Sequence, residues 1–232
     1  MTQLHEPKQD NFFQSWTIYR KIVAANNMFH EQIYADVKQL LQQQTDDFSL
    51  LDLGCGDAAC LAPVLRDVAI NAYTGVDLSA PALALAAENL SALSCPIQLE
   101  LNDLLSFMQQ QQHQYDVIFS SFALHHLSHA LKAQFFQAAR QSLATHGVLL
   151  LIDTFREPNE ALPNYLSAYC KWINNDWIGV SAEEKALACQ HIIDNDIPET
   201  LADTEQLAEQ AGFAQCQEIS NYRWHKVLLL SN

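Results

Sequence analysis

Short apolar runs alternate with segments of helical composition through the middle of the chain. Five such runs predict strands, at residues 49–53, 72–77, 97–101, 115–120 and 147–153, and the first of them has the composition of a buried strand. Helical composition lies between them, at residues 58–67, 80–93, 103–112 and 129–143. Ser79 is the expected N-cap of the second of these helices, and Gly147 is expected to end the loop into the fifth strand. The alternation predicts a parallel sheet with helices on both faces, because parallel strands need long crossover connections.

The pattern changes on either side of this region. Before it, residues 12–44 have apolar positions at helical spacing, broken at Asn26-Asn27, and residues 42–47 form a polar linker. After it, residues 156–200 contain no convincing strand and predict helices near 160–173 and 182–195. We therefore expect a helical cap at residues 12–44 and a helical lid insertion at residues 156–200.

Beyond residue 200, the pattern predicts a helix at 203–211 that ends at Gly212, and then strands at 214–220 and 223–230. The turn between these strands, at Asn221-Tyr222, is short enough to force an antiparallel hairpin at the sheet edge. The prediction is a single domain, 1–232, with an α/β core made of residues 45–155 and 201–232.

Composition indicates a globular protein and excludes several partners. Of the 232 residues 49% are hydrophobic, yet no apolar run approaches the roughly 20 residues of a membrane helix. Residues 1–11 are polar, and the six cysteines form no Cys-x-x-Cys pair, so we expect reduced thiols in a cytoplasmic protein. A net charge of −15 argues against nucleic acid as a partner. No membrane partner is expected, and the oligomeric state stays open between monomer and homodimer.

A glycine turn follows the first strand, and the strand ends in a carboxylate. Gly54 and Gly56 let the backbone turn sharply and approach a ligand closely. Asp77, at the end of the second strand, lies 25 residues after Asp52 (77 − 52) and can accept both hydroxyl protons of a ribose. The spacing fits the loose dinucleotide pattern and hence NAD. However, Asp52 beside a pyrophosphate is electrostatically unfavourable, whereas beside an ammonium or sulfonium group it is favourable.

Five motifs follow one another along the chain. They are Leu50-Leu51-Asp52-Leu53-Gly54-Cys55-Gly56, Tyr73-Thr74-Gly75-Val76-Asp77-Leu78-Ser79, Asn102-Asp103-Leu104, the segment from Tyr115 to Leu127 and the segment from Leu143 to Asp153. In this order they resemble the motifs of class I S-adenosylmethionine-dependent methyltransferases. The terminal hairpin is also a trait of the family. The chain departs from the family where Ala58 replaces a frequent third glycine. The resemblance implies a Rossmann-like seven-stranded sheet of order 3-2-1-4-5-7-6, with helices on both faces.

The same resemblance implies S-adenosylmethionine as the cofactor, bound at the carboxyl ends of strands 1, 2 and 4. The residues implied as its contacts are Asp52, Gly54, Cys55, Gly56, Asp77, Leu78, Asn102, Asp103, Leu104, Ser120 and Phe122. Arg20, in the N-terminal helical segment, could pair with the methionine carboxylate or form a surface salt bridge.

His125 and His126, in the loop after the fourth strand, are the candidate catalytic bases, with His125 preferred. One of the two rings could instead simply pack or cap. No metal site is expected, because adjacent histidines alone make no ligand set. Tyr165, Tyr169 and Trp172 are candidate substrate-binding residues, and with Trp177 could wall the acceptor pocket or form the core of the insertion.

The sequence thus predicts a methyltransferase that acts on oxygen or nitrogen of a small-molecule acceptor. Three alternatives remain. They are a protein methyltransferase, an NAD-binding oxidoreductase, and a binding module that keeps the cofactor pocket without transferring a methyl group. Asp52, the terminal hairpin and the lack of an evident Tyr-x-x-x-Lys set argue against the oxidoreductase.

Overall fold

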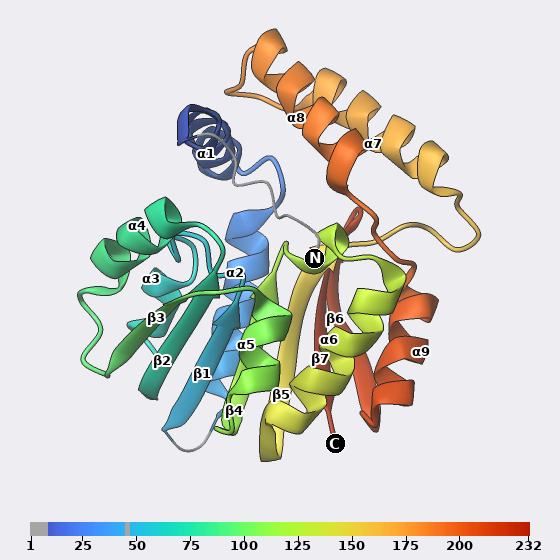
Figure 1. The fold of residues 1–232 in the computed structure, drawn as a ribbon. Coiled ribbons are helices and arrows are strands. Elements are labelled where there is room, and N and C mark those ends of the chain that lie inside the picture. The colour runs from blue at the N-terminus through green and yellow to red at the C-terminus, as the bar shows by residue number, and fades with distance from the viewer. Residues whose placement is uncertain (1–8, 45–46) are drawn as a thin grey trace.

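A seven-stranded sheet of order β3-β2-β1-β4-β5-β7-β6 forms the centre of the molecule (Figure 1). The computed structural model describes residues 9–44 and 47–232, so residues 1–8 of the polar start and residues 45–46 of the predicted linker lie outside it. β7 is antiparallel to both neighbours and the other pairs are parallel. The order is the predicted one. The strands are β1 (Phe48–Leu53), β2 (Ile70–Asp77), β3 (Ile97–Leu101), β4 (Tyr115–Ser121), β5 (Leu143–Thr154), β6 (Gln215–Tyr222) and β7 (His225–Ser231).

Helices cover both faces of the sheet (Figure 1). One hydrophobic core joins the sheet to α2 (His30–Gln42), α3 (Ala62–Leu65) and α4 (Ala80–Leu90). The other joins it to α5 (Leu104–Gln110), α6 (His129–Ser142) and α9 (Leu201–Ala211). Every residue of β1 is buried, as expected for a central strand of a parallel sheet. Ile33 and Val37 of α2 are fully buried against the sheet, so α2 is a layer of this core and not part of a cap.

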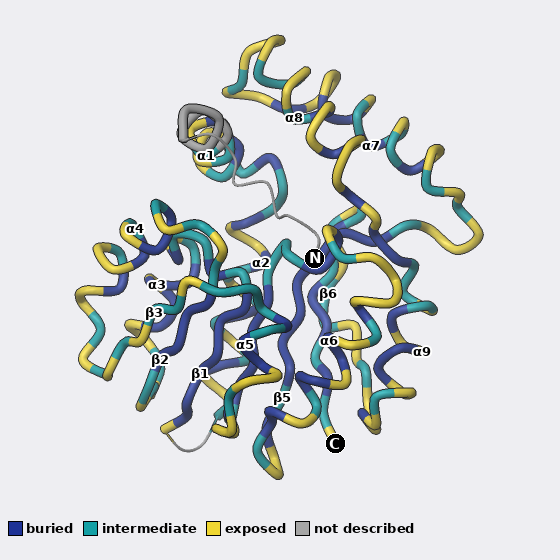
Figure 2. Tube along the Cα trace, viewed as in Figure 1, coloured by how far each residue is buried: buried dark blue, intermediate teal, exposed yellow. Residues whose placement is uncertain are grey.

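Three further helices lie above the carboxyl edge of the parallel strands (Figure 1). They are α1 (Gln9–Ala24), α7 (Leu162–Asp176) and α8 (Ala182–Asn195). Ile18 and Ile22 of α1 share a third hydrophobic cluster with Tyr169, Trp172 and Ile173 of α7. The upper surfaces of α7 and α8 are exposed (Figure 2). We call these three helices the cover.

Polar contacts join the chain around α1 to the chain around α7 and α8. The Asn27 side chain donates to the carbonyl of Ile178 at 2.8 Å and accepts from its N–H at 3.0 Å. Lys21 of α1 pairs with Glu184 of α8 at 2.5 Å. Within the described part of the chain, no helix is long and apolar enough to cross a lipid bilayer.

Several predicted local signals are present in the structure. The Ser79 side chain accepts from the N–H of Ala82, which makes Ser79 the N-cap of α4. Gly212 ends α9 in the left-handed conformation, with φ of 95°. A tight turn at residues 25–28 separates α1 from α2, where Asn26-Asn27 predicted a break.

Three local predictions were wrong. The helix expected at residues 58–67 is reduced to α3, because Ala58 is left-handed (φ 53°) and the chain turns until residue 61. Gly147 lies inside β5, and a Cβ there would be 2.8 Å from the carbonyl oxygen of Tyr115. The hairpin turns at Arg223-Trp224 rather than at Asn221-Tyr222, since Tyr222 still pairs with His225.

Candidate functional site

A cavity of about 540 Å³ opens at the carboxyl edge of the sheet, between the strands and the cover. Its volume lies in the range of about 300–1,000 Å³ that small-molecule sites occupy. Its lining comes from the turn after β1, the ends of β2 and β4, the start of α5 and all three helices of the cover. Open α/β sheets bind their ligands at this edge.

The floor of the cavity beside β1 is a turn that only glycine fits without strain. Gly54 has φ of 76°, and a Cβ there would be 2.8 Å from the Cβ of Ala123. Gly56 has φ of 52°, and a Cβ there would be 3.0 Å from Cη2 of Trp16 in α1. At both positions the missing Cβ leaves room for a neighbouring side chain, that of Ala123 at Gly54 and that of Trp16 at Gly56, so the turn packs closely against both.

Two carboxylates flank the glycine turn. Asp52 is 2% exposed and accepts a hydrogen bond of 2.7 Å from the hydroxyl of Tyr73. Burial raises the pKa of Asp52 to about 7, although the Tyr73 hydrogen bond opposes this rise. Asp77 accepts from the N–H groups of Gly56 at 2.9 Å and Ser79 at 2.8 Å. Burial also raises the pKa of Asp77, against the effect of these N–H donors.

A histidine that lines the cavity is paired with a buried aspartate. A short 3₁₀ turn, η1 (Leu124–His126), follows β4, and Asp153 lies near the end of β5. The carboxylate of Asp153 accepts from the backbone N–H of His125 at 2.9 Å and contacts its ring Nδ1 at 2.5 Å. Nδ1 therefore carries the hydrogen, and Nε2 presents a lone pair when the ring is neutral.

The charges around His125 change its basicity. Burial lowers the pKa of His125, but the charges of Asp153 and Asp196 outweigh burial, and the pKa lies above its usual value. For Asp153, burial raises the pKa, but the charge of His125 and its hydrogen bond hold it below the usual value. The ring of His125 is thus fixed in orientation and made more basic.

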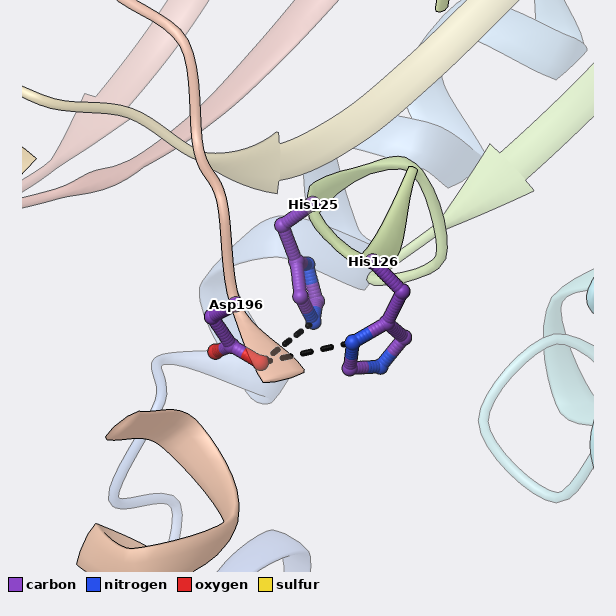
Figure 3. Close-up of side chains that lie close together, drawn as sticks. All are labelled: His125, His126 and Asp196. Atoms are coloured by element: carbon purple, nitrogen blue, oxygen red, sulfur yellow. Dashed lines mark ion pairs between the residues drawn. The ribbon is translucent and has the colours of Figure 1, made fainter. Parts of the chain in front are cut away.

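A second aspartate faces both histidines (Figure 3). Asp196, just after α8, places its Oδ1 3.3 Å from Nδ1 of His126 and 3.9 Å from Nε2 of His125. This residue is 7% exposed, and its Oδ1 has no hydrogen-bond partner among the described residues. His191 of α8 also lines the cavity, with its ring 5.5 Å from that of His126.

The cavity has an uneven charge. Five carboxylates line it, from Asp52, Asp57, Asp77, Asp103 and Asp196. Among the described residues, no lysine or arginine lines it. The cavity therefore favours cationic or neutral ligand groups over phosphates.

Most residues expected from the sequence line this cavity. They are Asp52, Gly54, Cys55, Gly56, Asp77, Leu78, Asn102, Asp103, Leu104, Phe122, His125, His126, Tyr169 and Trp177. Asp103 also caps α5, because its side chain accepts from the N–H of Ser106.

Four expected site residues lie elsewhere. Arg20 is exposed, and its neighbour Tyr19 lines the cavity instead. Ser120 is fully buried and donates to the carbonyl of Leu53, whereas Ser121 lines the cavity, as the alternation along a strand requires.

Tyr165 and Trp172 are the other two, and both are buried in the cluster beneath the cover. Tyr165 is bonded to the Thr154 hydroxyl at 2.8 Å. Trp172 is stacked on Phe29 with ring centroids 6.2 Å apart. These two side chains pack the insertion against the rest of the molecule and do not line the cavity.

Sequence reasoning missed Asp153 and Asp196 as site residues. Asp153 had a signal, since a carboxylate at the carboxyl end of a central strand lies at the ligand edge of the sheet. Asp196 had none, because the loop that carries it lies 70 residues from His126 in the sequence (196 − 126). Only the fold brings these groups together.

The comparisons with known proteins agree with this geometry. Residues 50–147 match the family model of a methyltransferase domain. The S-adenosylmethionine-dependent methyltransferase SibL in its apo form aligns with a TM-score of 0.62 and 18% identity, over 98% of this chain and 60% of that chain. No curated protein sequence matches the chain.

Two further solved structures are similar. A cyclopropane synthase from Mycobacterium tuberculosis has a TM-score of 0.57 and 21% identity, over 82% of this chain and 62% of that chain. Human N-acetylserotonin methyltransferase, in complex with S-adenosylmethionine, has a TM-score of 0.60 and 14% identity, over 85% of this chain and 51% of that chain. The present chain thus spans between half and two thirds of the length of these proteins.

The family match thus covers the part of the chain that contains most of β1, all of β2 to β4 and the glycine turn. The sheet order and the terminal hairpin are those of the class I S-adenosylmethionine-dependent methyltransferase fold, as the sequence predicted.

Proposed function

We propose that the protein is an S-adenosylmethionine-dependent methyltransferase that methylates an oxygen or nitrogen atom of a small molecule. The observation that carries this proposal is the charge of the cavity. Asp52 and Asp77 flank the glycine turn, and no lysine or arginine of the described chain lines the cavity. A cofactor with an ammonium, a sulfonium and a ribose fits these groups. A pyrophosphate, as in NAD, would face carboxylates with no compensating cation.

The chain's own residues have distinct roles in binding. Gly54 and Gly56 let the methionine part pass close to the backbone, and Asp52 attracts its positive charge. Asp77 retains acceptor capacity for the ribose hydroxyls beyond its two backbone donors. Asn102 and Leu104, at the start of α5, contact the adenine. When bound, the cofactor supplies an activated methyl group on its sulfonium sulfur.

The histidine side of the cavity receives the acceptor. When no metal ion is bound to its ring, His125 takes the proton from the acceptor's hydroxyl or ammonium group at Nε2, while Asp153 holds the ring in place. His126 and Tyr169 contact the acceptor from η1 and α7. The cover excludes water and aligns the acceptor with the methyl group.

A small acceptor is favoured over a protein side chain, because residues from all three cover helices help to line the cavity. Ile18, Tyr169 and Ile192 are such residues, one from each helix. A protein substrate would have to pass between these helices, which are joined by the Asn27 and Lys21 contacts.

The first test is a pair of calorimetric titrations of the purified protein, one with S-adenosylhomocysteine and one with NAD. We expect micromolar binding of the first and none of the second. A panel of small phenols, alcohols, amines and carboxylic acids is then incubated with S-adenosylmethionine, and methyl transfer is followed by mass spectrometry. Binding of NAD alone would overturn the proposal, and cofactor binding without any transfer across the panel would favour a binding module.

A further inference from the structure

Three potential metal ligands converge where the acceptor side of the cavity meets α8 (Figure 3). His125, His126 and Asp196 each offer one ligand atom, and these three atoms lie within 4.8 Å of one another. The nitrogens that face Oδ1 of Asp196 are Nδ1 of His126 and Nε2 of His125. The Asp196 oxygen is 3.3 Å and 3.9 Å from the two nitrogens. Zinc–ligand bonds of about 2.0–2.2 Å put neighbouring ligands of a tetrahedral site about 3.4 Å apart, so small side-chain movements suffice to bind an ion.

The aspartate of this group lacks the partners that burial demands. Asp196 is 7% exposed, yet its Oδ1 accepts no hydrogen bond from the described residues. His126 lies near this oxygen, but the contact is not a hydrogen bond. A buried carboxylate oxygen without a donor is costly, and a cation placed between it and the two imidazoles would remove that cost.

The contact between His125 and Asp153 orients the ring of His125 for binding a metal ion. Nδ1 of His125 is bonded to Asp153, which leaves the Nε2 lone pair directed at the cluster. A carboxylate behind a ligating imidazole is the usual way in which proteins orient such rings. The ring thus has the support that a metal ligand needs before any ion binds.

The loop that carries Asp196 is also fixed against η1. The N–H of Ile197 donates to the carbonyl of His125 at 2.7 Å. Lys132 donates to the carbonyl of Ile197 and pairs with Glu199 at 3.3 Å. The two ligand-bearing segments are therefore tied to each other directly, which is the preorganisation that a binding site requires.

We propose that His125, His126 and Asp196 form a binding site for one divalent transition-metal ion, of the zinc class, with a coordination position open to the cavity. Two imidazoles and one carboxylate with an open position are a ligand set that suits such ions and not magnesium or calcium. The role of the site rests on the proposed function. A bound ion would coordinate the acceptor's nucleophilic atom and lower the pKa of its proton, which would pass to water in the cavity, because the Nε2 lone pair of His125 would be held by the ion.

The test is a calorimetric titration of the chelator-treated full chain with Zn²⁺, and a parallel titration with Co²⁺ followed by visible absorption. We expect one ion per chain with micromolar or tighter affinity, and a cobalt spectrum typical of low coordination number. His126→Ala and Asp196→Asn should each weaken binding at least tenfold. His146→Ala, at an exposed position near the start of β5, should leave it unchanged.

The variants are chosen so that misfolding cannot imitate the result. The side chain of His126 is 41% exposed, so its removal leaves no large cavity in the core. Zinc binding that is absent, or equally tight in the wild type and in His126→Ala, would overturn the proposal. Titration of the metal-free protein with S-adenosylhomocysteine is independent of the three ligands. If it binds while zinc does not, the metal site fails and the methyltransferase proposal stands.

Discussion

The carboxylate of Asp77 accepts a hydrogen bond of 2.9 Å from the backbone N–H of Gly56. This bond ties the end of β2 to the glycine turn after β1, so the two parts of the candidate cofactor site are placed by one contact. A ligand that binds across this junction meets a prearranged carboxylate and backbone at once, and does not have to order them.

Substitution of Asp77 tests its assignment to the ribose. We expect Asp77→Ala to weaken the binding of S-adenosylhomocysteine at least tenfold, or about 1.4 kcal/mol, in calorimetry. Asp67→Ala removes an exposed carboxylate that pairs with Lys38, and should leave the affinity as it is. An unchanged dissociation constant in Asp77→Ala, with the fold intact, would refute the ribose role.

The contact between Gly54 and Ala123 allows a test of the turn. Gly54→Ala places a Cβ at φ of 76° and 2.8 Å from the Cβ of Ala123, so strain and overlap act together. We expect a loss of about 2 kcal/mol or more in the free energy of unfolding, measured by denaturant titration. Adding Ala123→Gly should recover the part due to overlap but not the part due to φ. No loss in the single variant would contradict the geometry.

The pKa of Asp52 predicts how cofactor affinity changes with pH. Burial raises this pKa to about 7, so the carboxyl is mostly protonated at pH 6 and mostly charged at pH 8. The charged form attracts the positive methionine part, and affinity should therefore rise with pH, by up to about tenfold over this interval. Calorimetry of S-adenosylhomocysteine at both pH values measures the change.

The matched variant for this prediction is Asp52→Asn, which keeps the shape of the side chain and removes its titration. Its affinity should be lower at pH 8 than that of the wild type and should change less between pH 6 and pH 8. A wild-type affinity that falls as pH rises would show that Asp52 does not face the positive part of the cofactor.

The sheet order implied by the resemblance to the methyltransferase family is confirmed, and most residues expected at the cofactor line the cavity, partly because some of them carry local signals. Glycines after a buried strand and acids at strand ends mark their own positions in the fold. Side chains alternate between the two faces of a strand, and this alternation was not used in predicting the site. The prediction named Ser120, whereas Ser121 lines the cavity. The helix expected at residues 58–67 was wrong for a different reason. Ala58 has a left-handed backbone conformation, and composition does not reveal such a conformation at an alanine.

The acceptor side was less predictable because it is assembled from distant segments. Tyr169 and Trp172 lie three positions apart on α7 and share one hydrophobic cluster, yet only Tyr169 lines the cavity. The spacing of apolar residues along a helix does not show whether a given face of the helix lines a cavity or packs against another element. Asp196 becomes a site residue only because Ile197 is bonded to the backbone of His125.

The pairing of His125 with Asp153 gives the last prediction. His125→Ala should lower the turnover of an identified acceptor by about 10²–10⁴, the contribution typical of a positioned proton acceptor, while the affinity for S-adenosylhomocysteine changes little. The ring lines the cavity but is not one of the groups proposed to bind the cofactor, so we expect its loss to affect the acceptor and not the cofactor. His146→Ala, at an exposed position outside the cavity lining, is the control and should keep full turnover. Steady-state kinetics and calorimetry on the same preparations separate the two quantities. If His125→Ala turned over as fast as the wild type, the ring would be a structural partner of Asp153 and nothing more.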